Sequence, residues 1–183
     1  MSRIHILGAS GSGTTTLGAA VAAELGCPHE DTDSYFWLPT DPPFTTARPR
    51  RERLALLLPR LAGPSWVLSG SATNWGAAIE PLYDLIVFLR LDRAQRMARL
   101  LQREGQRYGV RIEPGGDMAA HSHEFLDWAE SYDTAGPEHR SLASHERWLA
   151  SCACPVLRLD SAAPVEALTA AVLDCLPAIR KPV

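Results

Sequence analysis

Lysine is almost absent from this sequence. Of the 18 basic residues in the 183-residue chain, all but Lys181 are arginine. The basic residues stand against 21 acidic ones, which gives a formal net charge of -3 and a pI near 6.1. This balance excludes a protein that binds nucleic acid through bulk positive charge, so we expect no nucleic-acid partner. If the protein binds phosphate, the positively charged side chains that contact it are expected to be arginines.

Long apolar runs and metal-binding cysteine patterns are also missing. No run approaches the roughly 18 apolar residues of a membrane span, and residues 1–10 lack the apolar stretch of a signal peptide. The four cysteines form one C-x-C and no C-x-x-C, which gives neither zinc-site nor thioredoxin-like spacing. We therefore expect a cytoplasmic protein with no membrane partner and with free, structural thiols.

Short apolar runs alternate with helical patterns along the chain. This alternation predicts an α/β fold with a mostly parallel sheet, and the length favours one domain over residues 1–183. Strands are predicted at 3–7, 66–68, 85–89 and 156–159, with a short fifth near 28–31. Helices are predicted at 15–25, 49–61, 92–104, 121–132, 140–150 and 164–176. Two segments rich in proline or glycine, 38–49 and 105–117, interrupt the pattern, and we expect the second to be a mobile flap.

The most specific pattern is a glycine-rich segment between a predicted strand and a predicted helix. It comprises Gly8, Ala9, Ser10, Gly11, Ser12, Gly13, Thr14, Thr15 and Thr16. The segment resembles the phosphate-binding pattern G-x-x-x-x-G-K-[ST], in which backbone N–H groups and a helix N-terminus surround a phosphate. The hydroxyl of Thr15 occupies the position that ligates Mg²⁺. We predict that this phosphate loop binds the phosphates of a nucleotide, with Mg²⁺ at Thr15.

The phosphate loop has threonine where the pattern requires lysine. The lysine normally reaches the β- and γ-phosphates as a point charge, whereas Thr14 can only donate a hydrogen bond. Loss of one such donor costs roughly 10²–10³ in rate. Nucleotide binding is therefore better supported by the sequence than phosphoryl transfer.

The acidic residue that acts on Mg²⁺ in P-loop kinases is also missing from its usual position at the end of a strand. The strand at 66–68 runs into Ser69, where related kinases tend to have aspartate. The remaining acidic cluster is residues 29–33, and we select Asp33 from it to position Mg²⁺ or to accept a proton from a substrate. The alternative for Asp33 is a helix N-cap in a solvated loop.

Arginine is concentrated between residues 90 and 111. On one continuous helix, Arg96, Arg99, Arg103, Arg107 and Arg111 fall within about 120° of arc. The opposite, core-facing arc would hold Ala94, Met97, Ala98 and Leu101. We expect Gly105 and Gly109 to break this helix, which would place the last two arginines on the flap.

Such an arginine stripe is most often a solvated face. Beside a phosphate loop, however, planar guanidinium groups can bind phosphate oxygens and stabilise a transferring phosphoryl group. We predict catalytic roles for Arg99 and Arg103, and phosphate contacts for Arg107 and Arg140. A second cluster, residues 48–53, either grips an acidic group of an acceptor or is an exposed helix start.

Together these motifs resemble the adenylate-kinase-like P-loop kinases over roughly residues 2–160. The resemblance is carried by the phosphate loop, Asp33 with the aromatic residues 35–37, residues 67–70, the strand 85–89, and Arg99-x-x-x-Arg103 before the flap. It is closest to the bacterial branch called topology-modulation proteins, which are predicted nucleotide kinases. The family usually has lysine at position 14 and an acid at position 69.

The resemblance implies a three-layer P-loop NTPase fold with a five-stranded parallel sheet and an arginine-rich lid. Residues 34–60 would bind the acceptor and residues 105–137 would form the lid. The implied function is transfer of the ATP γ-phosphate to a nucleotide or to another small molecule, such as a shikimate-like acid. The alternative is a nucleotide-binding regulatory protein with weak or no catalysis, because Thr14 and Ser69 replace two functional residues.

Overall fold

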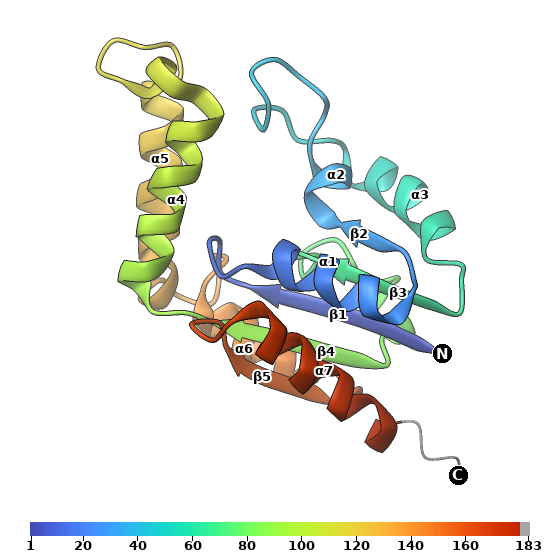
Figure 1. Ribbon diagram of the computed structural model, residues 1–183. Coiled ribbons are helices and arrows are strands. Elements are labelled where there is room, and N and C mark those ends of the chain that lie inside the picture. Colours follow the sequence, from blue (N-terminus) through green and yellow to red (C-terminus); the bar gives the residue numbers. More distant parts are fainter. Residues whose placement is uncertain (180–183) are drawn as a thin grey trace. The chain divides into compact units, whose positions relative to one another are not determined.

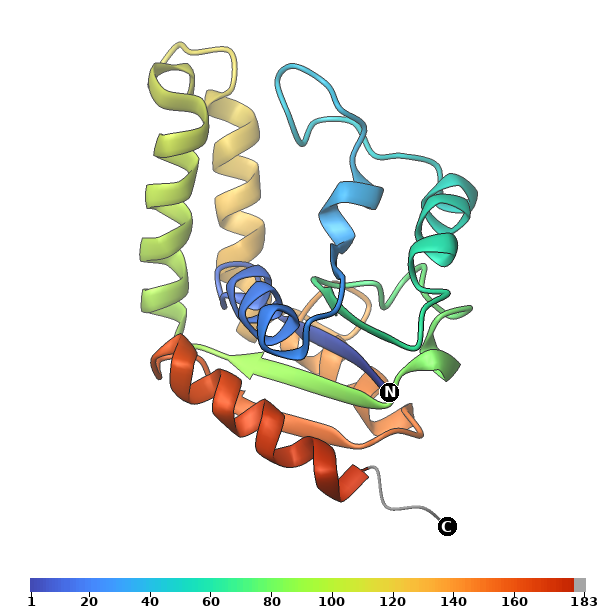
Figure 2. The same ribbon diagram turned by 45° about the vertical axis from the view of Figure 1, so that its right-hand side comes forward.

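A computed structural model of the chain describes residues 1–179 (Figures 1 and 2). Lys181 lies outside the described residues. The strands are β1 (Ser2–Gly8), β2 (His29–Asp31), β3 (Ser65–Ser69), β4 (Leu85–Arg90) and β5 (Val156–Asp160). The α-helices are α1 (Thr14–Leu25), α2 (Thr32–Phe36), α3 (Arg50–Arg60), α4 (Arg93–Tyr108), α5 (Ala119–Glu130), α6 (Leu142–Ser151) and α7 (Val165–Ile179). Short 3₁₀ helices are η1 (Glu80–Leu82), η2 (Gly109–Ile112) and η3 (Ser131–Asp133).

The five strands form one parallel sheet in the order β2-β3-β1-β4-β5. The central strand β1 pairs with β3 on one side and with β4 on the other, so that Ile4 is aligned with both Val67 and Leu85. All five carboxyl ends therefore lie at one edge of the sheet. The predicted α/β fold with a five-stranded parallel sheet is confirmed.

The core explains why these apolar runs become strands. Residues 85–89 of β4 are fully or almost fully buried, as expected for a strand covered on both faces. On one face, Ile4, Val67 and Val87 pack beneath α1 and α7, which contribute Leu17 and Val172. Among residues 1–179, no helix combines the length and apolar character needed to cross a membrane.

The chain divides into two compact units. The first contains the sheet and consists of Met1–Gly8, Gly13–Leu89 and the chain from Cys152 onward. The second consists of Ala9–Ser12 and Arg90–Ser151, which includes α4, α5 and α6. In the second unit α4 and α5 run side by side in both views (Figures 1 and 2), and Ser122 of α5 donates a hydrogen bond to Glu104 of α4 at 3.0 Å.

Two sequence predictions about α4 are wrong. Gly105 does not break the helix, which continues to Tyr108 and ends at Gly109. The core-facing side is also misplaced, because the buried residues are Arg96, Leu100, Glu104 and Tyr108, whereas Leu101 is 56% exposed. The helical pattern predicts that the arginines face water, but the long side chain of arginine can enter a core when its donors are satisfied.

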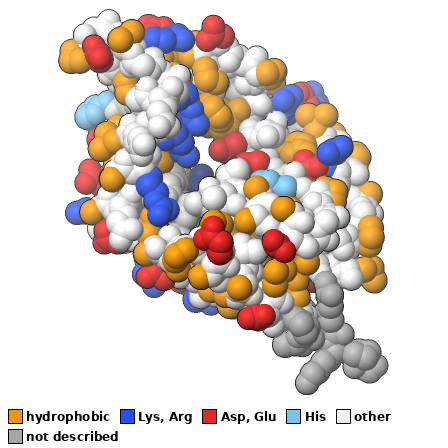
Figure 3. Space-filling view, in the orientation of Figure 1, with side chains coloured by type: hydrophobic (Ala, Val, Ile, Leu, Met, Phe, Trp, Pro, Cys, Tyr) orange, Lys and Arg blue, Asp and Glu red, His pale blue; other side chains and the backbone are white. Residues whose placement is uncertain are grey.

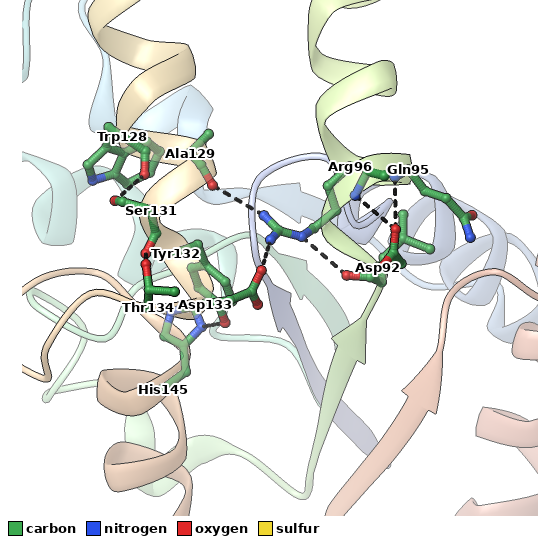
Figure 4. Close-up of polar contacts among 12 residues, drawn as sticks. Asp92, Gln95, Arg96, Trp128, Ala129, Ser131, Tyr132, Asp133, Thr134 and His145 are labelled. Carbon is green, nitrogen blue, oxygen red and sulfur yellow. Dashed lines mark hydrogen bonds and ion pairs between the residues drawn. The ribbon is translucent and has the colours of Figure 1, made fainter.

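Arg96 is the residue that reverses the expected orientation (Figure 4). Its side chain is 1% exposed and forms an ion pair with Asp133 of η3. The remaining guanidinium donors reach the carbonyls of Leu91 and Ala129 at 3.2 and 3.3 Å. Next to it, the hydroxyl of Tyr132 is 2.8 Å from Nδ1 of the buried His145. Arg96 thus joins the start of α4 to the end of α5, and it is not free to bind phosphate.

We predict that Arg96→Ala lowers the free energy of unfolding by about 3 kcal/mol, because it leaves buried carbonyls and Asp133 without their donor. The matched control is Arg93→Ala, which removes an exposed arginine from the first turn of the same helix. The control is expected to change stability by less than about 0.5 kcal/mol. Chemical denaturation measures both, and equal losses would contradict a structural role for Arg96.

Candidate active site

The phosphate loop joins the end of β1 to the first turn of α1. Gly11 and Gly13 have positive φ angles of 82° and 88°, a backbone conformation that glycine adopts without strain. Within the second unit, a Cβ atom added to Gly11 would lie 2.9 Å from the carbonyl oxygen of Arg96. Glycine at position 11 is therefore required both by its dihedral angle and by its close approach to α4.

Thr15 and Asp31 form the central contact of the site. The hydroxyl of Thr15 donates to Oδ2 of Asp31 at 2.6 Å, and the contact is exposed. Thr15 lies in the first turn of α1 and Asp31 ends β2, so both are held at the carboxyl edge of the parallel sheet. Because the single hydroxyl hydrogen of Thr15 is directed to Asp31, its oxygen lone pairs remain available to a cation.

The three acids of the cluster at 29–33 have different positions. Glu30 is buried and accepts hydrogen bonds from Tyr35 and, at 2.8 Å, from Arg60. Burial and the bond to Glu30 raise the pKa of Tyr35 to about 12. Asp33 is exposed in the first turn of α2, and its backbone N–H donates to Oδ1 of Asp31 at 2.9 Å. Asp31, rather than the predicted Asp33, therefore contacts the hydroxyl of Thr15.

Ser69 lies where the sequence suggested that an acid was missing. Its hydroxyl donates to Oδ2 of Asp31 at 3.0 Å, and its oxygen is 3.0 Å from Nε2 of His29. The next residue, Gly70, has a φ of 91°, and an added Cβ there would lie 2.0 Å from the hydroxyl oxygen of Thr32. The end of β3 thus has no carboxylate of its own at position 69, and the carboxylate of Asp31, at the end of the neighbouring strand β2, lies beside Ser69.

Thr14, the residue in the lysine position, begins α1 and is half-buried. In the described part of the chain its hydroxyl makes no side-chain hydrogen bond. Thr14 can therefore offer one neutral donor at the end of the phosphate loop, and it brings no charge.

In the second unit, basic side chains line up along α4 (Figure 3). Arg99 is exposed, and its Nη1 lies 3.4 Å from the carbonyl oxygen of Gly11, which brings this arginine against the phosphate loop. Arg103 is exposed and its guanidinium lies 5.9 Å from the ring of Phe125. The structure thus brings one of the two predicted catalytic arginines to a loop residue.

The other two arginines predicted to contact phosphate are engaged elsewhere in the second unit. Arg107 forms an ion pair with the buried Glu104 at 3.4 Å. The guanidinium of Arg140 is half-buried and lies 5.4 Å from the ring of Trp128. These contacts give both residues a structural role, and their predicted contacts with phosphate stay predictions.

The predicted acceptor segment contains an arginine that lies close to two aromatic rings. The guanidinium of Arg53 lies 3.8 Å from the centre of the Phe36 ring and 5.9 Å from that of Trp75. Its Nε donates to the carbonyl of Arg48 at 2.6 Å. Burial, with a further contribution from Arg50, lowers the pKa of Arg53. No carboxylate pairs with Arg53 among residues 1–179, so its outer donors face no counter-charge.

The donor set at Thr15 and Asp31 fits Mg²⁺. Both side chains offer hard oxygen atoms, and Mg²⁺ is usually held by one or two protein oxygens together with water and substrate phosphates. Within the described residues, no group of three or more His, Cys, Asp or Glu side chains could form an all-protein metal site. Thr15 and Asp31 alone would leave most of the coordination positions of Mg²⁺ to other oxygen ligands.

Sequence reasoning missed Asp31, His29 and the aromatic contacts of Arg53. Asp31 is the last residue of the three-residue strand β2. Ligands bind at the carboxyl ends of parallel strands, so a carboxylate at a strand end is the sequence signal that favours Asp31 over Asp33. The contact of His29 with Ser69 spans 40 residues and follows from the pairing of β2 with β3. No local pattern in the sequence reports it.

No known family profile matches the chain. A relative does match along almost its whole length: the uncharacterized protein YqaC of Bacillus subtilis (strain 168) is 45% identical over 174 residues. The alignment covers 94% of this chain and 96% of that protein. The chain belongs to the YqaC family.

Solved structures with the same fold include several P-loop kinases. Shikimate kinase from Bacteroides thetaiotaomicron has a TM-score of 0.61 at 16% identity, covering 96% of this chain and 98% of its own. Shikimate kinase from Acinetobacter baumannii, in complex with shikimate, gives 0.60 at 14% identity with coverage of 100% and 96%. A gluconokinase from Sinorhizobium meliloti gives 0.53 at 18% identity, covering 98% of each chain. At these identities the likeness shows that this YqaC-family chain has the fold of P-loop kinases.

Proposed function

We propose that this chain is an ATP-dependent kinase that transfers the γ-phosphate to a small hydroxylated acceptor. The observation that carries the proposal is the contact between Thr15 and Asp31, directly behind a glycine-rich phosphate loop. It joins the hydroxyl of the loop pattern to a carboxylate, which is the pair that a nucleotide-bound Mg²⁺ needs. The kinase folds of the structural neighbours support the same function. The adenylate-kinase-like, topology-modulation branch remains our assignment within these kinases.

The roles of the residues follow from their chemistry. The loop amides and the hydroxyl of Thr14 bind phosphate oxygens, and Thr15 and Asp31 hold Mg²⁺. A Mg²⁺ ion held there would neutralise negative charge that develops during transfer. Arg99 and Arg103 supply the positive charge that lysine supplies in other phosphate loops. An acceptor hydroxyl forms a bond to the γ-phosphorus while the bond to the ADP oxygen breaks, and Asp33 accepts the hydroxyl proton.

The contacts of Arg53 indicate the class of acceptor. Arg53 has no carboxylate partner within residues 1–179, and its guanidinium lies over Phe36 and near Trp75, so it is suited to bind an anionic group of a small molecule. A phosphate or a carboxylate meets this requirement, so nucleoside monophosphates and hydroxylated acids are the two classes to test. Shikimate, present in one of the neighbouring kinase structures, is an acid of the second class.

We predict that the protein produces ADP from ATP and Mg²⁺ only when such an acceptor is present. A panel of nucleoside monophosphates, hydroxylated acids and neutral polyols tests this, with ADP formation followed by a coupled assay. Neutral polyols are expected to be inactive because they offer nothing for Arg53 to bind. A folded preparation that forms no ADP beyond background with any anionic acceptor would contradict the proposed function.

The substitution Asp31→Asn tests whether the measured kinase activity comes from the candidate site or from a contaminating enzyme. Removal of the carboxylate from Thr15 is expected to lower acceptor-dependent turnover by at least about tenfold. Glu24→Gln is the matched control, because it removes one negative charge from an exposed position on α1. It should retain the turnover of the unmodified protein.

The alternative function is a nucleotide-binding regulatory protein that transfers little or no phosphate. The observation that favours it is Thr14, which leaves the loop without its own cation. It predicts that ATP binds with measurable heat while no acceptor is consumed.

Thr14→Lys distinguishes the two functions. If the site is arranged around Thr14, as we propose, turnover is expected to fall, because the longer side chain fills space beside the loop amides that bind phosphate. A site that has lost its catalytic lysine would instead gain roughly 10²–10³ in turnover. Thr14→Met adds similar length without charge and controls for bulk. Steady-state kinetics with an active acceptor, or single-turnover ATP hydrolysis without one, provides the measurement.

A further inference from the structure

The ring of His29 occupies a space that a helix glycine leaves open. His29 begins β2, and its Nε2 is 3.0 Å from the hydroxyl oxygen of Ser69. A Cβ atom added to Gly18 of α1 would lie 2.5 Å from the same Nε2 and 3.0 Å from Cβ of Ser69. Gly18 is buried, so a larger residue could not turn outward into solvent. The absence of a side chain at position 18 is therefore what allows His29 to reach Ser69.

The hydrogen-bond donors in this cluster can be assigned by counting hydrogens. An ionised carboxylate only accepts, so the hydroxyl of Ser69 donates its single hydrogen to Oδ2 of Asp31. No hydrogen is then left on Ser69 for a bond to His29. The 3.0 Å contact must therefore be a donation from Nε2–H of His29 to the oxygen of Ser69. His29 therefore carries a proton on Nε2, and in its neutral form this is the Nε2–H tautomer.

We propose that His29 is a positioning residue for the cation site, a role that rests on the function proposed above. By donating to Ser69, it fixes the Ser69 hydroxyl on Asp31, and Asp31 is thereby held against Thr15. The chain runs from His29 through Ser69 and Asp31 to Thr15, and each link is between 2.6 and 3.0 Å.

This arrangement explains how the site works with serine at position 69. A second carboxylate there would face Asp31 at hydrogen-bond distance and repel it. With the imidazole in its neutral form, the His29–Ser69 pair orients Asp31 and leaves one negative charge beside Thr15. Groups that orient a metal-binding carboxylate in this way typically account for 10- to 100-fold in metal affinity.

The first test measures the tautomer in the unmodified protein. Long-range ¹H–¹⁵N spectra at pH 8 are expected to show the Nε2–H form for His29, and Ser69→Ala is expected to shift its ¹⁵N resonances. His29→Phe assigns the signals by removing them. A predominant Nδ1–H form would overturn the proposal without any substitution that could disturb folding.

The second test measures ATP affinity by calorimetry in EDTA and in Mg²⁺, with thermal unfolding as the check of folding. His29→Phe is expected to lower the Mg²⁺-dependent gain in ATP affinity about tenfold and to leave the affinity in EDTA unchanged. His29→Gln is expected to recover most of the loss, because its side-chain amide can donate from a similar position. A purely structural role for His29 would not produce this difference between the two conditions.

Gly18→Ala disturbs the contact between His29 and Ser69 by placing a Cβ atom of α1 against the imidazole ring. It is expected to weaken the Mg²⁺-dependent gain in ATP affinity as well. Gly105→Ala is the control, because position 105 is also inside a helix and an added Cβ there meets no atom within 4 Å. Equal Mg²⁺-dependent affinity in the unmodified protein and His29→Phe would overturn this inference alone. Absence of Mg²⁺-dependent ATP binding in the unmodified protein would overturn the proposed function, and this inference with it.

Discussion

The hydrogen bond between Thr15 and Asp31 is the interaction on which the candidate site depends. The two residues are 16 positions apart and belong to different elements, yet a parallel sheet brings the ends of β1 and β2 to one edge. Around this bond, Ser69 and His29 fix the carboxylate, and Gly70 and Gly18 leave the space that the arrangement requires. The position of one hydroxyl hydrogen then decides where a cation can find oxygen lone pairs.

The scarcity of lysine limits the ways in which this site can handle phosphate. With Thr14 in the lysine position, positive charge has to come from arginine side chains. The structure divides the arginines of α4 by role: Arg96 is buried in an ion pair, Arg107 neutralises Glu104, and Arg99 lies against a loop residue. The arginine stripe is therefore no uniform phosphate-binding surface. Its members serve packing and charge balance as well, and the guanidinium of Arg99 lies 3.4 Å from the carbonyl oxygen of Gly11.

Local pattern was sufficient for the fold because strands and the phosphate loop are encoded in adjacent residues. The apolar run at 85–89 and the glycines before α1 each predict one structure. The orientation of α4 could not be predicted, because the partner of Arg96 lies 37 positions away, and helix packing overrides the cost of about 1 kcal/mol of a glycine at 105. In the site, the loop could be found from sequence, whereas the choice between Asp31 and Asp33 depended on where β2 ends.

The most direct measurement of the central claim is a crystal structure with a non-hydrolysable ATP analogue and Mn²⁺, located by anomalous scattering. The account predicts one manganese peak about 2.0–2.2 Å from the hydroxyl oxygen of Thr15, with Asp31 binding it directly or through one water, and an arginine contacting the β- or γ-phosphate. A nucleotide bound in the loop with no metal at Thr15, or with the metal held by Asp33 without Asp31, would contradict it.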